Sequence, residues 1–137
     1  MGDVPVAETF YKKATELAPF HPDFRSKYAL ALATLDKKFE ARVQYQTVVD
    51  QYPEFVPALT NLGYLWLEEG DDQKAEQYYQ KALALSPDDE QALMNTAGLY
   101  IYRKNYKEAM VYVDRTLKHH PQNKQALQLK AQLQQLK

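Results

Sequence analysis

The chain has 137 residues and a formal net charge of −1, with 45% hydrophobic and 26% charged residues. This balance is typical of one globular domain, and it offers no basic surface for nucleic acid or for an anionic membrane. The lack of cysteine excludes disulfides, thiol catalysis and cysteine-ligated metal, and no apolar run is long enough to span a bilayer.

Residues 4–18 predict a helix, because their apolar side chains recur every three or four residues. The apolar positions are Ala7, Phe10, Tyr11, Ala14 and Leu17. Their pattern matches the second helix of the units that follow, and no first helix stands before it. We therefore expect a half unit over residues 1–21, cut from a longer protein. Its apolar face would be open on one side and available for contact.

Residues 22–55 predict two helices joined by a turn. Pro22 suits the first turn of a helix, where its missing amide costs nothing. The turn at residues 36–38 lacks glycine, so we expect it to be irregular. The second helix ends before Pro53, which has no amide to continue it. The side chains expected to face the core are Tyr28, Ala29, Leu32, Leu35, Ala41, Tyr45, Val48 and Val49.

Residues 56–89 give the clearest unit, with a turn at residues 69–72 between two amphipathic helices. The first helix has an apolar stripe of Leu59, Leu62, Gly63, Trp66 and Leu67, and the second has Ala75, Tyr78, Tyr79, Ala82, Leu83 and Leu85. The acidic residues Asp71, Asp72, Asp88 and Asp89 lie just before helices, where carboxylates cap free amides. We assign them to capping, not to acid–base catalysis.

Residues 90–123 repeat the pattern, and Asn105 in the turn is expected to take left-handed backbone. Residues 124–137 predict one further helix, whose apolar positions alternate with glutamines. A helix with a polar back is what a stack of repeats needs to cover its last apolar face. His119 and His120 are adjacent and have no third ligand at suitable spacing, so no metal site is predicted.

Four columns of residues recur at an interval of 34. They are Pro19, Pro53, Pro87 and Pro121; Ala7, Ala41, Ala75 and Ala109; Tyr11, Tyr45, Tyr79 and Val113; and Ala14, Val48, Ala82 and Thr116. The central unit resembles a tetratricopeptide repeat, on the motif Leu59, Leu62-Gly63, Trp66, Ala75, Tyr79 and Pro87. The resemblance covers nearly the whole chain.

The resemblance implies an all-α, right-handed α-solenoid of helix–turn–helix repeats with about eight helices. Its divisions would be a half repeat at 1–21, three repeats at 22–55, 56–89 and 90–123, and a capping helix at 124–137. It also implies a non-enzymatic module without cofactor, which binds a protein or peptide partner in a concave groove lined by the first helix of each repeat.

Helical phase predicts which side chains face that groove: Asp23, Ser26, Leu30, Ala33, Thr34, Thr60, Tyr64, Leu67, Glu68, Met94, Gly98, Ile101, Tyr102, Gln125, Gln128, Gln132 and Gln135. The candidate partner-binding residues among them are Leu30, Thr60, Tyr64, Leu67, Met94, Gly98, Ile101 and Tyr102. Exposed aromatic and apolar residues of this kind are common anchors of recognition. The competing interpretation is that they only pack within their own repeat. Burial of both Tyr64 and Tyr102 would exclude the groove assignment.

Some members of the resembled family hold acidic peptide ends with Lys, Asn and Arg at set places of the first helices. Asn61 and Asn95 match the Asn place, but the other places hold Ser26, Leu30, Thr60, Tyr64, Gln91 and Gln125. We therefore expect a neutral or apolar segment as partner. The alternative function is assembly, in which the terminal helices form a homodimer or pack within a larger protein, with Phe10 and Leu17 at the contact.

Overall fold

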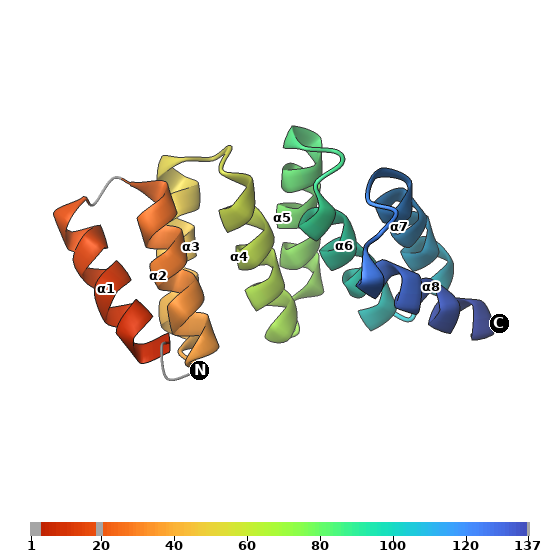
Figure 1. Ribbon diagram of the computed structural model, residues 1–137, viewed down its shortest axis with the longest axis horizontal. Helices are drawn as coiled ribbons and strands as arrows, with labels where there is room; N and C mark the ends of the chain where they lie inside the picture. Colours follow the sequence, from red (N-terminus) through yellow and green to blue (C-terminus); the bar gives the residue numbers. More distant parts are fainter. Residues whose placement is uncertain (1–3, 19–20, 137) are drawn as a thin grey trace.

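The computed structural model describes residues 4–18 and 21–136, and these form eight helices and no strand. The helices are α1 (Val4–Leu17), α2 (Pro22–Thr34), α3 (Lys38–Gln51), α4 (Val56–Glu68), α5 (Asp72–Leu85), α6 (Glu90–Tyr102), α7 (Tyr106–His119) and α8 (Lys124–Gln135). They follow one another along a row, with α1 and α8 at opposite ends (Figure 1). Each helix packs on the next, and α4 also contacts α6. The predicted all-α solenoid is confirmed.

The turns between paired helices share one geometry. Asp36, Gly70 and Lys104 have positive φ angles of 63°, 88° and 60°, which is the left-handed conformation that ends many helices. The same backbone bond closes each turn: Lys37 N to Leu32 O (2.8 Å), Asp71 N to Trp66 O (2.9 Å) and Asn105 N to Tyr100 O (2.8 Å). The expectation of an irregular turn at 36–38 is therefore wrong, because Asp36 adopts the conformation that Gly70 adopts.

Polar side chains cap the helix starts. Asp71 accepts a hydrogen bond from Lys74 N at 3.1 Å, and Asp89 accepts one from Ala92 N at 2.9 Å, which confirms their predicted role. The caps of α5 and α6 are these two residues; Asp72 bonds instead to Arg103 at 2.6 Å, and Asp88 lies 3.1 Å from Nε2 of His119. Asn105 caps α7 in the same way and has a φ of −95°. The prediction that Asn105 takes the left-handed position is thus wrong, since Lys104 occupies it.

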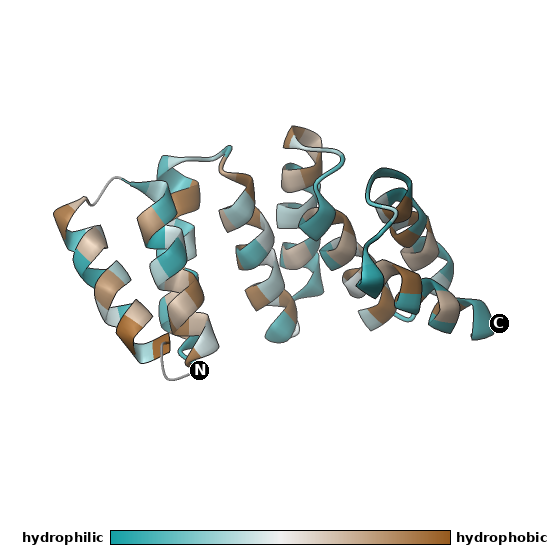
Figure 2. Cartoon of the chain, in the orientation of Figure 1, coloured by the Kyte–Doolittle hydropathy of each residue, from teal (hydrophilic) through white to brown (hydrophobic). Residues whose placement is uncertain are grey.

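The core follows the repeating columns. Ala41, Ala75 and Ala109 are fully buried, as are Tyr45 and Tyr79, and apolar and polar surface alternates around each helix (Figure 2). Small residues are required where the two helices of a repeat come close to each other. A Cβ added to Gly63 would lie 2.7 Å from Cε1 of Tyr79 and 3.3 Å from the carbonyl oxygen of Ala75, closer than normal packing allows.

Trp66 fills the wider space between the first two full repeats. Its ring lies between two cations, with Arg42 Cζ 4.2 Å and Lys74 Nζ 4.0 Å from the ring centroid. Arg42 belongs to α3 of the preceding repeat and Lys74 to α5 of the same repeat, so the indole ring is held between two adjacent repeats. Tyr100 occupies the same column one repeat later and stacks on Tyr112, with ring centroids 5.6 Å apart.

Ion pairs join each repeat to the next, and their sign alternates. Residues 8, 42 and 76 occupy equivalent places in α1, α3 and α5 and are Glu, Arg and Glu. Their partners at the end of the following first helix or in its turn have the opposite charge: Glu8–Lys37 (2.9 Å), Arg42–Glu69 and Glu76–Arg103 (3.1 Å). If a repeat packed one place further along the stack, each of these charged residues would therefore face a residue of the same charge.

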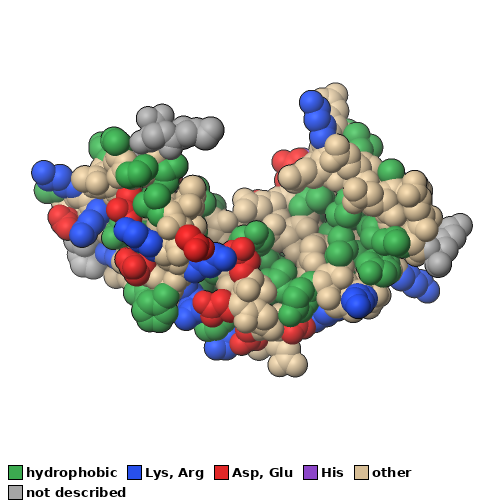
Figure 3. Space-filling view, turned by 90° about the horizontal axis from the view of Figure 1, so that it is seen from below, with side chains coloured by type: hydrophobic (Ala, Val, Ile, Leu, Met, Phe, Trp, Pro, Cys, Tyr) green, Lys and Arg blue, Asp and Glu red, His purple; other side chains and the backbone are tan. Residues whose placement is uncertain are grey.

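The row of helices is curved. Seen from below, the surface is hollowed between the N-terminal and the C-terminal helices (Figure 3). Such curvature arises when each repeat is rotated slightly relative to the one before it. It gives the molecule one hollow side on which several repeats can contribute to a single site.

Candidate functional site

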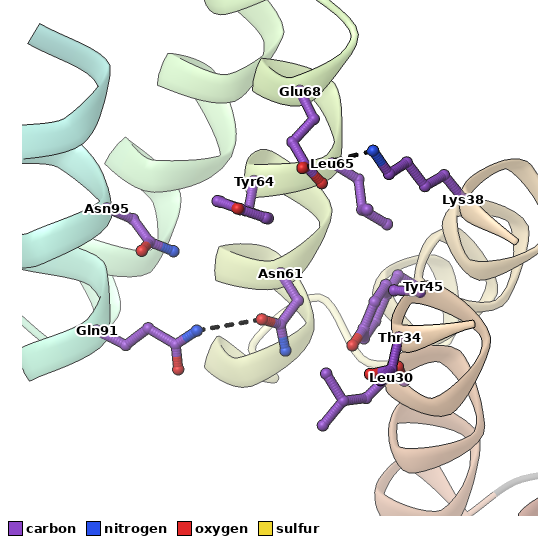
Figure 4. A pocket seen from close by; sticks show the side chains of 11 residues that line it. Leu30, Thr34, Lys38, Tyr45, Asn61, Tyr64, Leu65, Glu68, Gln91 and Asn95 are labelled. Atoms are coloured by element: carbon purple, nitrogen blue, oxygen red, sulfur yellow. Dashed lines mark hydrogen bonds and ion pairs between the residues drawn. The ribbon is translucent and has the colours of Figure 1, made fainter. Parts of the chain in front are cut away.

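A pocket of about 380 Å³ lies where the first helices of the three full repeats come together. Side chains from α2, α4 and α6 line it, together with two from α3 (Figure 4). We call this space the inner pocket; it is lined by Leu30, Ala33, Thr34, Lys38, Tyr45, Asn61, Tyr64, Leu65, Glu68, Gln91 and Asn95. Its residues come from three repeats, so only the stacked fold brings them together.

Two large side chains give the inner pocket an apolar surface. Leu30 on α2 is 53% exposed, and Tyr64 on α4 is 48% exposed. By contrast, Leu59 and Leu93 in the core are fully buried, as are Tyr45 and Tyr79. A partner that covered Leu30 and Tyr64 would gain the free energy of removing apolar area from water, roughly 25 cal/mol per Å².

Amide side chains form the polar part of the inner pocket. Gln91 on α6 donates to Asn61 Oδ1 on α4 at 3.1 Å, which ties the two helices across the pocket (Figure 4). The Nδ2 of Asn95 is buried and has no hydrogen-bond partner among residues 4–18 and 21–136. A buried donor without an acceptor costs ~1–3 kcal/mol, and most such groups in proteins are satisfied.

Tyr45 closes the floor of the inner pocket. It is 1% exposed, and burial raises the pKa of its hydroxyl, so the group stays neutral at physiological pH. It can act as a hydrogen-bonding group there but not as a base.

The charges of the inner pocket balance. Its one cation, Lys38, lies 3.5 Å from its one anion, Glu68, and both belong to the lining residues. Lys38 also lies 3.7 Å from Asp36. The one lining cation is therefore paired with carboxylates of the chain itself.

Of the eight candidate partner-binding residues, Leu30 and Tyr64 line the inner pocket. Both Tyr64 and Tyr102 are exposed, so the condition that would have excluded the groove assignment is not met. Thr60 is 1% exposed, and its hydroxyl donates to the backbone of its own helix, at Val56 O (3.3 Å) or Pro57 O (3.0 Å). The prediction that Thr60 lines the groove is therefore wrong.

Three further predicted residues are partly buried against the core. Leu67 packs on Tyr79 and Leu99, and Met94 and Ile101 pack around the buried residues of α6 and α7. For these three, packing within the stack accounts for much of the side chain. Gly98 and Tyr102 lie outside the inner pocket, and a Cβ on Gly98 would meet no described atom within 4 Å.

The predicted groove residues include Thr34 and Glu68 of the polar lining but not the amides Asn61, Gln91 and Asn95, because the predicted helical phase was one residue off at α4. α4 packs against α3, α5 and α6, so only a narrow strip of its surface stays open. Thr60 falls on the packed side of that strip, and Asn61 falls on the open side. The 34-residue period held a usable signal, because Asn61 and Asn95 occupy the same column.

The hollow side continues towards α1. A second pocket of about 360 Å³ lies between α1 and α2, and it shares Leu30 and Thr34 with the inner pocket. Its other lining residues are Val4, Ala7, Tyr11, Lys27 and Ala31. The two pockets therefore meet at α2.

Within the described part of the chain, no group of His, Asp and Glu residues is placed to hold a metal ion. None of the described helices is long and apolar enough to cross a membrane.

Comparison with known families returns two matches. Two sequence models described as tetratricopeptide repeat match the chain, one over residues 67–133 and the other over residues 40–90. A comparison with curated proteins returns no significant match.

Solved structures of several proteins share the fold. TTC0263, a thermophilic TPR protein in Thermus thermophilus, is 20% identical with a TM-score of 0.85, over 98% of this chain and 73% of that one. A tetratricopeptide repeat protein from Parabacteroides merdae ATCC 43184 is 25% identical with a TM-score of 0.80. This chain is covered to 98% but spans only 54% of that protein. The first TPR of Spaghetti, bound to the HSP90 peptide SRMEEVD, is 19% identical with a TM-score of 0.79, over 84% of this chain and 94% of that one.

Proposed function

Because the chain belongs to the tetratricopeptide repeat family, we propose that it is a non-catalytic module that binds a neutral or apolar segment of a partner protein along its hollow side. Repeats of this family mediate protein–protein interactions, and stacked repeats offer extended concave surfaces for them. The observation that carries the proposal is the inner pocket, where exposed Leu30 and Tyr64 lie beside amide side chains of α4 and α6.

The amides fit the backbone of a bound peptide. The buried Nδ2 of Asn95 needs an acceptor, and a peptide carbonyl of the partner can supply one. Asn61 and Gln91 already bond to each other at 3.1 Å, so their remaining donors and acceptors are held in fixed directions. Polar groups that are fixed before binding lose less entropy when the ligand arrives.

The apolar groups fit the side chains of that peptide. Leu30 and Tyr64 flank the pocket from α2 and α4, and a leucine- or aromatic-sized side chain between them would cover both. Tyr102 extends the same hollow side beyond the pocket, and we propose that it contacts the end of a longer segment. Gly98, with open space above it, leaves room for the backbone of such a segment.

Charge argues against an acidic partner end. The peptide bound by Spaghetti is SRMEEVD, which contains three carboxylate side chains. In the inner pocket Lys38 is paired with Glu68, so an acidic peptide would lose water without gaining a free cation. We propose that this chain binds segments without a cluster of acidic residues.

The test is a screen of displayed random peptides against the purified chain, followed by fluorescence anisotropy on the enriched sequences. Tyr64→Ala is expected to weaken a selected peptide by ~2 kcal/mol, about 30-fold, as for other central aromatic anchors. Phe39→Ala is the matched control, because Phe39 is an aromatic residue with 66% exposure that does not line the pocket.

Three results would contradict the proposal. The screen could yield no peptide, the selected peptides could be acidic and depend on Lys38, or Phe39→Ala could weaken binding as strongly as Tyr64→Ala. Asn95→Ala separates the two parts of the argument. It should weaken all selected peptides to a similar extent if it serves their backbone, and only some of them if it reads side chains.

A further inference from the structure

The two terminal helices each leave one face open, and the two faces are complementary. Among the described residues, α1 occupies the place of a second helix with no first helix of its own repeat packed on it, and α8 occupies the place of a first helix with no second helix of its own repeat packed on it. They lie at opposite ends of the row (Figure 1). In the three full repeats, the equivalent faces pack against each other and form the core.

The open face of α8 corresponds to the face by which the first helices of the full repeats pack against their second helices. Leu127 is 50% exposed, whereas Leu93 and Leu59, one and two repeats earlier in the same column, are fully buried. Ala131 is likewise exposed, although it continues the column of small residues to which Gly63 belongs. The other side of α8 is packed, because Ala126 and Leu133 are buried.

The open face of α1 corresponds to the face by which the second helices of the full repeats pack against their first helices. Tyr11 continues the column of Tyr45 and Tyr79, which are 1% and 0% exposed, yet Tyr11 itself is only partly buried. Phe10 is 62% exposed. At the equivalent place Tyr78 and Tyr112 are partly buried and pack in the core clusters.

We propose that the open face of α8 in one chain binds the open face of α1 in a second copy, so that the two helices complete one repeat between two chains. The interface continues the one that already joins the paired helices within the chain. Tyr11 of the second copy would lie over Ala131 as Tyr79 lies against Gly63 in the second full repeat. Phe10 and Leu127 would be covered at the same time.

This contact joins two different surfaces, so a pair of chains still has one unused α1 face and one unused α8 face. Each added chain leaves one α1 and one α8 open, and association therefore continues head to tail. A symmetric dimer, by contrast, would use the same surface of both chains. The contact lies at the ends of the row. Its face on α1 includes Tyr11, which lines the second pocket, whereas Asn61, Tyr64 and Asn95 of the inner pocket lie on neither terminal helix, so association can be lost while peptide binding at the inner pocket is retained.

The experiment uses two charged variants of exposed residues, Phe10→Glu on α1 and Leu127→Glu on α8, in sedimentation equilibrium at protein concentrations up to about 500 μM. The unmodified chain is expected to show a mass that rises with concentration beyond that of a dimer. Each variant alone is expected to stay monomeric, because every copy carries the same charged face and the contact needs one unmodified α1 face and one unmodified α8 face. An equimolar mixture is expected to stop at twice the monomer mass, since one intact α8 meets one intact α1.

Val43→Glu is the control, because Val43 is 45% exposed on α3, away from both ends, and it should leave association unchanged. Far-UV circular dichroism verifies that every variant is folded. An unmodified chain that stays monomeric would overturn the proposal and show that α8 acts as a cap. Association that stops at a dimer, survives either single variant, or is not restored in the mixture would also overturn it.

Discussion

Gly63 and Gly98 allow one substitution to be tested in two opposite environments. Both are interior residues of first helices, α4 and α6. In an exposed helix, Gly→Ala stabilises by roughly 1 kcal/mol, because alanine loses less backbone entropy on folding. The atoms around each glycine then decide whether the substitution raises or lowers the free energy of unfolding.

At Gly63 the added methyl has no room. Its Cβ would lie 2.7 and 2.9 Å from two ring carbons of Tyr79, and 3.3 Å from the carbonyl oxygen of Ala75. Tyr79 is fully buried, so its ring cannot swing away. Overpacking of this kind costs ~1–3 kcal/mol, and we take the upper half of that range because the ring is rigid. With the gain of about 1 kcal/mol subtracted, Gly63→Ala is expected to destabilise the chain by about 1–2 kcal/mol.

At Gly98 the added methyl meets no described atom within 4 Å. Only the gain in helix propensity remains, and Gly98→Ala is expected to stabilise by about 0.5–1 kcal/mol. The two variants have the same composition, so any difference between them comes from position alone.

The assay is urea unfolding followed by far-UV circular dichroism, with the slope of the transition compared between variants. Thermal midpoints should shift by roughly 4 °C per kcal/mol for a chain of this size, downwards for Gly63→Ala and upwards for Gly98→Ala. Ala29 occupies the column of Gly63 in the first repeat, where it faces Tyr45. If Gly63→Ala proved stabilising, α4 would have moved relative to α5 to the spacing of that repeat, and the steric argument would be refuted.

Three further tests address the packing and the junctions between repeats. Ala75→Leu places a large side chain at a fully buried site and should lower the free energy of unfolding by ~1–3 kcal/mol; an unchanged urea midpoint would contradict the close approach of α4 and α5. Arg42→Glu and Glu69→Arg should each destabilise, while the double reversal should recover most of the loss, with a coupling of ~0.5–1 kcal/mol; additive effects would disprove the pairing. Arg103 bonds to two carboxylates and lowers the pKa of both. That stability is present above the ordinary carboxyl pKa values and is lost as pH falls through the lowered ones. The unmodified chain should therefore lose more stability between about pH 5 and pH 2 than Arg103→Gln does; parallel pH profiles would count against the network.

The sequence alone was sufficient for the fold because the determining pattern is local and repeated. Each repeat fixes its own core through residues three and four apart, and its own ends through prolines and capping residues. Asp71 and Asp89 could be assigned as caps for this reason. The left-handed turn residue was harder to predict, since Asp36 and Lys104 adopt the backbone of Gly70 under constraint from the paired helices.

The site depended on the angle between repeats, which no local pattern specifies. Tyr64 could be placed on the hollow side, but Thr60 and Asn61 differ by only one position on a narrow strip, and the packing of α4 against three neighbours decided which of them is open. The sequence by itself determined that one helical hairpin is repeated and which residues form its core. Only the tertiary structure decided which amides meet in the inner pocket and which charges pair between repeats, because those residues lie about one repeat apart and are brought together by the rotation of one repeat on the next.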